Sequence, residues 1–87
     1  MAENIFVVEV YPDSDEVDLS EILEEIKRKL PEYAELVAHK IEPFVYGVNK
    51  LILRIKVPEK EGLADEIENI LSEIEGISAE VVRMGRL

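Results

Sequence analysis

The sequence contains the same pattern twice, and this repeat constrains the fold more than any other feature. The segment VEVYP ends at Pro12, and the segment IKVP ends 46 residues later at Pro58. Each proline is followed by an acidic loop, an amphipathic stretch with helical spacing and a segment rich in β-branched residues. Two strand–helix–strand units in succession fold most simply as an antiparallel sheet with both helices on one face. We therefore predict an α+β sandwich with the order βαββαβ.

Local signals set the predicted boundaries of these elements. Strands are expected over residues 5–11, 34–42, 48–57 and 77–84, and helices over residues 19–30 and 63–75. Asp18 stands three residues before Glu21, which is a capping-box pattern for the first helix. Pro31 is expected to end that helix, Pro43 to end or disrupt the second strand, and Gly76 to take the C′ position of the second helix.

The strand predicted over residues 48–57 has two different faces. One face is apolar and consists of Leu51, Leu53, Ile55 and Val57. The other is largely basic and consists of Lys50, Ile52, Arg54 and Lys56. We expect the apolar face to pack against the helices and the basic face to lie on the open side of the sheet.

Length and composition limit the class of protein. With 87 residues, the chain is long enough for a single domain over residues 1–87 and too short for two. The absence of cysteine excludes disulfides and thiolate metal sites. No apolar run reaches the roughly 18 residues of a membrane span, and no basic segment precedes the apolar residues near the N-terminus. These features predict a cytoplasmic protein without a membrane partner.

The charge is strongly negative but unevenly distributed. Twenty acids and ten Lys and Arg residues give a net charge of −10, so the protein repels polyphosphate at long range and nucleic acid is a poor partner. Residues 1–26 contribute −9, residues 27–56 contribute +4, residues 57–75 contribute −6 and residues 76–87 contribute +1, which sum to −10. An anionic surface could therefore dock on the middle of the chain or on its C-terminal end.

Motifs for catalysis or for metal and cofactor binding are not found. The acidic loop from Asp13 resembles a calcium loop, but Asp18 occupies the position that requires glycine. His39 is the only histidine and lacks catalytic neighbours in the sequence, so a histidine on a strand surface is expected. The four glycines are dispersed and form no phosphate-binding loop. We predict a protein that is not an enzyme and that has no metal site and no cofactor.

Two other binding functions are compatible with a domain of this shape. RNA-binding modules stack bases on aromatic residues of the central strands, but the strand KLILRIKV has none and the net charge is unfavourable. Small-ligand regulatory domains bind amino acids near the first strand–helix loop. Here that loop carries four carboxylates, which would repel the carboxylate of an amino acid. This second function remains as the alternative.

Two segments invite an explanation beyond packing. In PFVYGVNK, Phe44 and Tyr46 flank a hairpin connection, and Gly47 permits a positive φ and close approach by another backbone. These rings either pack on the edge of a small core or are exposed for a partner. In the C-terminal VVRMGRL, Gly85 is expected to loosen the chain before Arg86, although an ordinary frayed end is the simpler interpretation.

These segments also carry a resemblance to a known family. KIEPFVYGVNKLILRIKV, GISAEVV and the final MGRL resemble archaeal elongation factor 1-beta, the guanine-nucleotide exchange factor of translation elongation factor 1-alpha. The most specific part is the pattern P-x-x-Y-G-x-x-K-L, which begins at Pro43. The resemblance covers the full length, including the opening strand and EVDL, and it implies a ferredoxin-like fold.

The resemblance also implies roles for individual residues. In eukaryotic relatives, an aromatic ring at the position of Tyr46 presses on the GTPase and a lysine at the position of Arg86 reaches toward its magnesium site. This chain has tyrosine and arginine at these positions. We expect Phe44, Tyr46, Gly47 and Arg86 to form the exchange wedge. Contacts that anchor the partner are expected from Asn49, Lys50 and Arg54.

Overall fold

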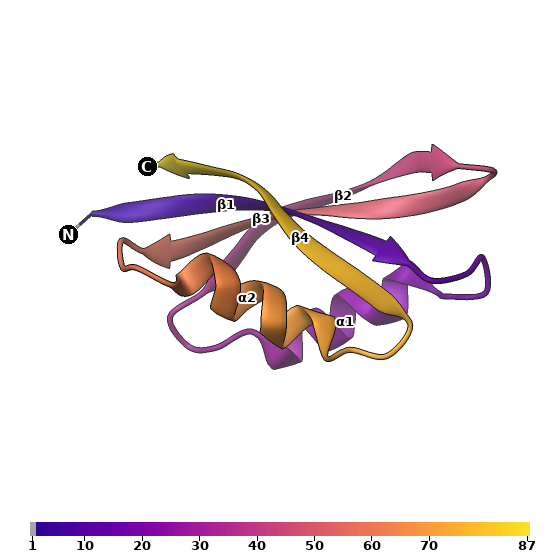
Figure 1. Cartoon of the computed structure of the whole chain (residues 1–87), viewed down its shortest axis with the longest axis horizontal. Helices are drawn as coiled ribbons and strands as arrows, with labels where there is room; N and C mark the ends of the chain where they lie inside the picture. Colours follow the sequence, from indigo (N-terminus) through magenta and orange to yellow (C-terminus); the bar gives the residue numbers. More distant parts are fainter. Residues whose placement is uncertain (1) are drawn as a thin grey trace.

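The computed structural model, which describes residues 2–87, has the predicted βαββαβ order (Figure 1). The strands are β1 (Glu3–Pro12), β2 (Glu35–Val45), β3 (Val48–Pro58) and β4 (Ile77–Arg86), and the helices are α1 (Leu19–Lys29) and α2 (Leu63–Ser72). The strands form one sheet in the order β2-β3-β1-β4, and every neighbouring pair is antiparallel. Both helices lie on the same side of this sheet (Figure 1). The predicted ferredoxin-like sandwich is confirmed.

The core lies between the sheet and the two helices. The central strands contribute alternate residues, namely Phe6, Val8 and Val10 from β1 and Leu51, Leu53, Ile55 and Val57 from β3. The helices contribute Leu19, Ile22, Leu23, Ile26, Leu63, Ile67 and Leu71. Strand side chains alternate between the two faces, so the residues between these positions lie on the face that no helix covers. The prediction for the two faces of β3 is confirmed.

Asp18 begins the first helix as its N-cap. Its carboxylate accepts a hydrogen bond from the backbone N–H of Ser20 at 2.9 Å, which satisfies a donor that the helix itself leaves free. The acceptor role predicted for Asp18 is confirmed. The donor belongs to the second helical residue, however, whereas the capping-box pattern with Glu21 implied the third.

Pro43 disrupts the second strand without ending it, which is one of the two predicted outcomes. β2 continues to Val45, with an irregularity in its pairing with β3 between Pro43 and Val45. Because β2 is an edge strand, a proline there need not remove a hydrogen bond of the ladder. The hairpin of β2 and β3 is therefore longer than the sequence suggested.

Gly76 does not serve as the C′ residue of α2, because that helix ends at Ser72. The glycine instead adopts a φ of 92° in the turn that enters β4. Its carbonyl oxygen accepts a hydrogen bond of 2.8 Å from the N–H of Asp13. This bond joins the turn before β4 to the loop after β1.

Neither helix described within residues 2–87 is long and apolar enough to cross a membrane.

Candidate partner-binding site

Tyr46 and Gly47 alone form the turn between β2 and β3. Both have positive φ, 50° for Tyr46 and 76° for Gly47, as the tight turn of a two-residue hairpin with right-handed twist requires. Glycine adopts this conformation without penalty, whereas a tyrosine there is strained. The side chain of Tyr46 is fully exposed, with a relative accessibility of 101%. The ring therefore does not stabilise the fold by packing in the core, and its position is set by a strained backbone.

Further apolar side chains surround this turn. Ile41, Phe44 and Val45 are each between 46% and 48% exposed. They lie on β2, the edge strand of the hairpin. Together with Tyr46 they form what we call the hairpin tip. A concentration of exposed apolar residues at one end of a charged domain is typical of a protein-binding surface.

Four side chains brace the base of the hairpin on the open face of the sheet. The ring of Phe44 lies 5.0 Å from that of Tyr11, centroid to centroid, and the Nζ atom of Lys50 lies 5.7 Å from the Phe44 centroid. Lys50 also forms an ion pair of 3.3 Å with Glu9. The hydroxyl of Tyr11 donates to the same carboxylate. We call Glu9, Tyr11, Phe44 and Lys50 the bracing cluster.

The shared carboxylate changes the pKa of two groups in this cluster. The hydrogen bond from Tyr11 is the main reason that the pKa of Glu9 lies below its usual 4.5. Burial opposes this shift in the pKa, and the hydrogen bond and the charge of Lys50 add to it. The same hydrogen bond, together with burial, raises the pKa of Tyr11 to about 12. Both shifts favour the ionised carboxylate and the neutral phenol at neutral pH, so the cluster is intact there.

The three residues predicted to anchor the partner occupy different surroundings. Lys50 belongs to the bracing cluster and is only 19% exposed, while Arg54 is exposed on the same open face. Asn49 alternates with Lys50 along β3 and therefore lies on the other face. There it lines a cleft with Gly47 and Val48.

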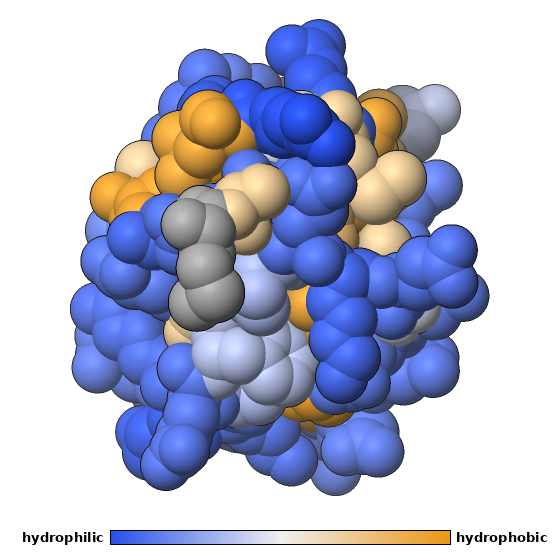
Figure 2. Space-filling view, turned by 90° about the vertical axis from the view of Figure 1, so that its left-hand side faces the viewer, coloured by the Kyte–Doolittle hydropathy of each residue, from blue (hydrophilic) through white to orange (hydrophobic). Residues whose placement is uncertain are grey.

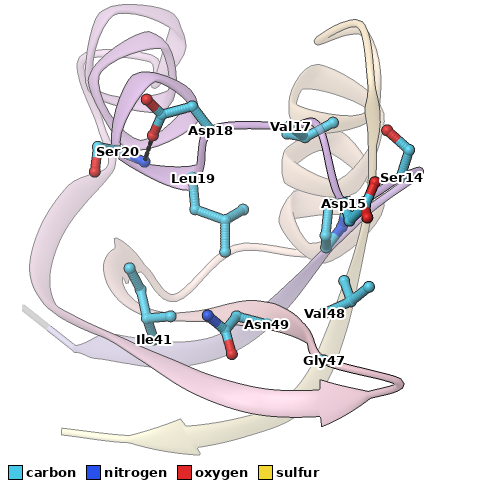
Figure 3. A pocket seen from close by; sticks show the side chains of 11 residues that line it. Ser14, Asp15, Val17, Asp18, Leu19, Ser20, Ile41, Gly47, Val48 and Asn49 are labelled. Atoms are coloured by element: carbon cyan, nitrogen blue, oxygen red, sulfur yellow. Dashed lines mark hydrogen bonds between the residues drawn. The ribbon is translucent and has the colours of Figure 1, made fainter.

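That cleft lies between the hairpin and the loop that joins β1 to α1 (Figure 3). Its volume is about 280 Å³. Asp15 lines the loop side, and the carboxylate of Asp18 bonds to the backbone of Ser20 (Figure 3). Within residues 2–87, no three His, Cys, Asp or Glu side chains are close enough together to hold a metal ion.

Arg86 lies in an ordered strand, contrary to the expectation that Gly85 would loosen the chain. Gly85 pairs with Ile5, Arg86 pairs with Asn4, and the N–H of Leu87 donates to the carbonyl of Glu3 at 2.9 Å. The glycine has no positive φ. The guanidinium of Arg86 forms an ion pair of 2.7 Å with Glu59 and is still 72% exposed.

This end of the molecule also exposes apolar side chains. Met84 and Leu87 are 63% and 70% exposed, and with Arg86 they form what we call the C-terminal end. Seen from this side, apolar surface appears among hydrophilic side chains, mainly toward the sheet (Figure 2). The molecule thus has two partly apolar ends.

Tyr46 and Arg86 lie at opposite ends of the sheet. Tyr46 precedes Val48 at the start of β3, whereas Arg86 pairs with Asn4, which pairs in turn with Val57 near the end of β3. Nine residue steps of a strand span about 30 Å. Figure 1 shows the C-terminus and the hairpin turn at the two ends of the long axis, which measures 41 Å. The predicted wedge residues are therefore not assembled at one point.

Glu9 and Tyr11 of the bracing cluster were not predicted from the sequence. Tyr11 and Glu9 follow the alternation of β1, in which Phe6, Val8 and Val10 face the core, so their place on the open face could have been read from the strand pattern. Their proximity to Phe44 depends on the order of the strands in the sheet. The alternation of residues along a strand does not give that order.

The family model described as the EF-1 guanine nucleotide exchange domain matches residues 5–87. The chain belongs to this family. The exchange-domain family was predicted from the sequence, and that prediction is confirmed together with the function of guanine-nucleotide exchange.

Relatives of similar length support the assignment to the exchange-domain family. Elongation factor 1-beta of Sulfolobus acidocaldarius is 45% identical over 95% of this chain and 94% of its own. The protein of the same name from Sulfurisphaera tokodaii is 45% identical over 100% of this chain and 98% of its own. That from Saccharolobus islandicus is 40% identical with the same coverage.

The fold is also similar to that of a chain in a solved structure. A chain in the crystal structure of the archaeal box H/ACA sRNP Nop10-Cbf5 complex matches 98% of this chain with a TM-score of 0.55. The match covers 27% of that chain at 16% identity. At this identity the similarity concerns the fold alone.

Proposed function

We propose that residues 1–87 act as one exchange domain that binds elongation factor 1-alpha in the cytoplasm and promotes the release of GDP. The observation that carries this proposal is the ring of Tyr46, fully exposed on a strained turn. Strain in the backbone at an exposed residue is typical of functional sites. A ring held in this way can enter a pocket of a partner without first leaving contacts of its own.

The two ends of the molecule contact two separate parts of the GTPase. Tyr46 and Arg86 are about 30 Å apart, which is too far for both to act on the same few atoms. Each end also presents exposed apolar side chains that a partner could cover. The hairpin tip displaces or holds one element, while Arg86 acts near the metal ion and the phosphates.

Release of GDP follows from linked binding equilibria. GDP and Mg²⁺ order the switch segments and the phosphate loop of a GTPase. A factor that binds better to the nucleotide-free form must weaken the affinity for nucleotide by the same factor. About 4 kcal/mol of coupling corresponds to roughly a thousandfold loss of affinity. On this mechanism the chain makes and breaks no covalent bond.

Arg86 must break its ion pair with Glu59 before its guanidinium can bind the GTPase. Its ion pair with Glu59 joins two exposed side chains, and such pairs stabilise a protein by about 1 kcal/mol or less. The guanidinium is permanently charged and can bind phosphate or carboxylate oxygens, but it is larger and flatter than an ammonium group. We therefore propose that Arg86 binds close to the metal ion of the GTPase and does not take the position of that ion.

Release of a fluorescent GDP analogue from elongation factor 1-alpha tests the proposal. At micromolar concentration the wild-type chain should accelerate release, and Tyr46→Ala should slow the accelerated rate at least tenfold. An Arg28→Ala variant serves as a control, since Arg28 is exposed in the last turn of α1 and belongs to neither end. No acceleration by the wild-type chain would refute the function.

A further inference from the structure

Arg54 and Arg83 face each other across a single residue of the open sheet face. Arg54 on β3 and Arg83 on β4 are both in register with Val7 on β1, one from each side. Two strand spacings separate the backbones of the two arginines by about 10 Å. If both arginine side chains lean inward over Val7, their guanidinium groups can bind the same small anion.

These two arginines differ from the other cations of the same face. Lys40, Lys50 and Lys56 form ion pairs with Glu42, Glu9 and Glu35, respectively. Within the part of the chain that the structure describes, Arg54 and Arg83 have no ion pair or side-chain hydrogen bond, and both are exposed. A protein with twice as many acids as bases thus leaves two neighbouring guanidinium groups uncompensated.

The surface around the two arginines is hollow and partly apolar. They line one hollow of about 560 Å³, whose lining includes Val7, Ile52 and Val82. An apolar floor lowers the local dielectric constant and strengthens a charge-assisted hydrogen bond above it. The guanidinium group binds a carboxylate through two parallel hydrogen bonds.

The nearby acids decide which anion fits this hollow. Glu9 also lines the hollow, in the next row of the sheet, and its carboxylate is engaged by Lys50 and Tyr11. Glu80 pairs with Glu9 in that row and remains exposed. Glu80 and the total charge repel a polyphosphate, with its several charges, much more strongly than a single carboxylate, which can approach Arg54 and Arg83 from above Val7.

We infer that Arg54, Val7 and Arg83 form a carboxylate-binding site that receives an Asp or Glu side chain of the GTPase. The inference rests on the proposed function, because the site lies between the hairpin tip and the C-terminal end. A partner that contacts both ends from the sheet side covers it. Arg54 was predicted as an anchor from the sequence, and Arg83 is its counterpart on the edge strand β4, on the other side of β1.

Equilibrium binding to elongation factor 1-alpha tests this site with Arg54→Gln, Arg83→Gln and the double variant. Each single substitution should raise the Kd about tenfold, because one charge-assisted hydrogen-bonded pair is lost. The double variant should raise the Kd by clearly less than the hundredfold product, because both arginines hold the same carboxylate. The dependence of Kd on salt should weaken in all three variants.

Arg28→Gln is the matched control, since this exposed arginine lies on α1 on the opposite side of the sheet. Its Kd should equal that of the wild type. The inference is overturned if the double variant binds like Arg28→Gln, or if the effects of the two single substitutions multiply fully. Failure of the wild-type chain to bind or to accelerate GDP release would instead refute the proposed function, so the two failures are distinguishable.

Discussion

The ring of Tyr11 packs against the ring of Phe44 at 5.0 Å, with an angle of 43° between the ring planes. The contact joins β1 to the edge strand β2 across the intervening strand β3. Since Phe44 stands two residues before Tyr46, the contact fixes the direction in which the hairpin tip leaves the sheet.

A double-mutant cycle should detect this coupling between Tyr11 and Phe44. We expect Tyr11→Ala and Phe44→Ala to destabilise the domain by less together than the sum of their separate effects, with a coupling free energy of about 0.5–1.5 kcal/mol. Urea denaturation of the four proteins measures it. Additive effects would show that the hairpin is positioned without the ring contact.

Replacement of Tyr46 by asparagine should separate stability from function. Asparagine tolerates the left-handed conformation that Tyr46 adopts, and Asn-Gly is a favoured sequence for such a turn. We expect Tyr46→Asn to raise the free energy of unfolding by about 0.5 kcal/mol and to slow nucleotide exchange at least tenfold. Thermal denaturation and GDP release measure the two effects. A stabilised variant with full exchange activity would remove Tyr46 from the mechanism.

Arg86 can be tested more cleanly by substitution than by truncation. Removal of Arg86 and Leu87 would also remove the last pairing of β4 and the bond from Leu87 to Glu3. Arg86→Gln keeps this backbone pairing, and we expect it to slow exchange while the midpoint of thermal unfolding changes little.

Glu59→Gln tests the role of Arg86 in the opposite direction, because it is expected to speed exchange. It releases the guanidinium from its ion pair, so exchange at subsaturating concentrations should increase by up to about fivefold, the equivalent of about 1 kcal/mol. If Glu59→Gln slows exchange as much as Arg86→Gln does, the ion pair itself is what the partner needs, and the release of Arg86 is not part of the mechanism.

The bracing cluster predicts how stability varies with pH. The folded-state pKa of Glu9 is lowered, so its contribution is complete above the ordinary value of 4.5 and is lost as the pH falls through the lower value. The pKa of Tyr11 is raised to about 12, so its contribution is complete below pH 10 and is lost as the pH rises toward 12. The unfolding free energy should be measured over both pH ranges. In Tyr11→Phe it should depend less on pH both in the acid range (the acid limb) and in the alkaline range (the alkaline limb).

Tyr33→Phe is the control for this pH profile. Burial, with the hydrogen bond to Glu66, raises the pKa of Tyr33 to about 12 as well. This variant should therefore change the alkaline limb but leave the acid limb of Glu9 intact. An acid limb that changes equally in both variants would show that the Tyr11–Glu9 bond does not determine the pKa of Glu9.

The order of elements and the composition of the core could be predicted from the sequence, because both depend on local periodicity. The alternation of Leu51, Leu53, Ile55 and Val57 predicted a strand with one buried face, and these four side chains are buried. Asp18 likewise acts on backbone groups within its own turn. The effects of two other residues depend on neighbouring strands. Pro43 disrupts the pairing but does not end β2, because β2 is an edge strand. The expectation that Gly85 loosens the chain was wrong, because Gly85 is held by pairing with Ile5.

The amino-acid sequence by itself determined the exchange-domain family, the two-layer fold and the presence of aromatic residues at the hairpin turn, whereas the exposure of Tyr46 was decided by the structure. Only the tertiary structure decided that Tyr46 and Arg86 lie at opposite ends, that Tyr11 braces Phe44, and that Arg54 and Arg83 flank Val7. These relationships follow from the strand order β2-β3-β1-β4 and its register. Strand order results from the packing of the whole sheet, which no local segment specifies.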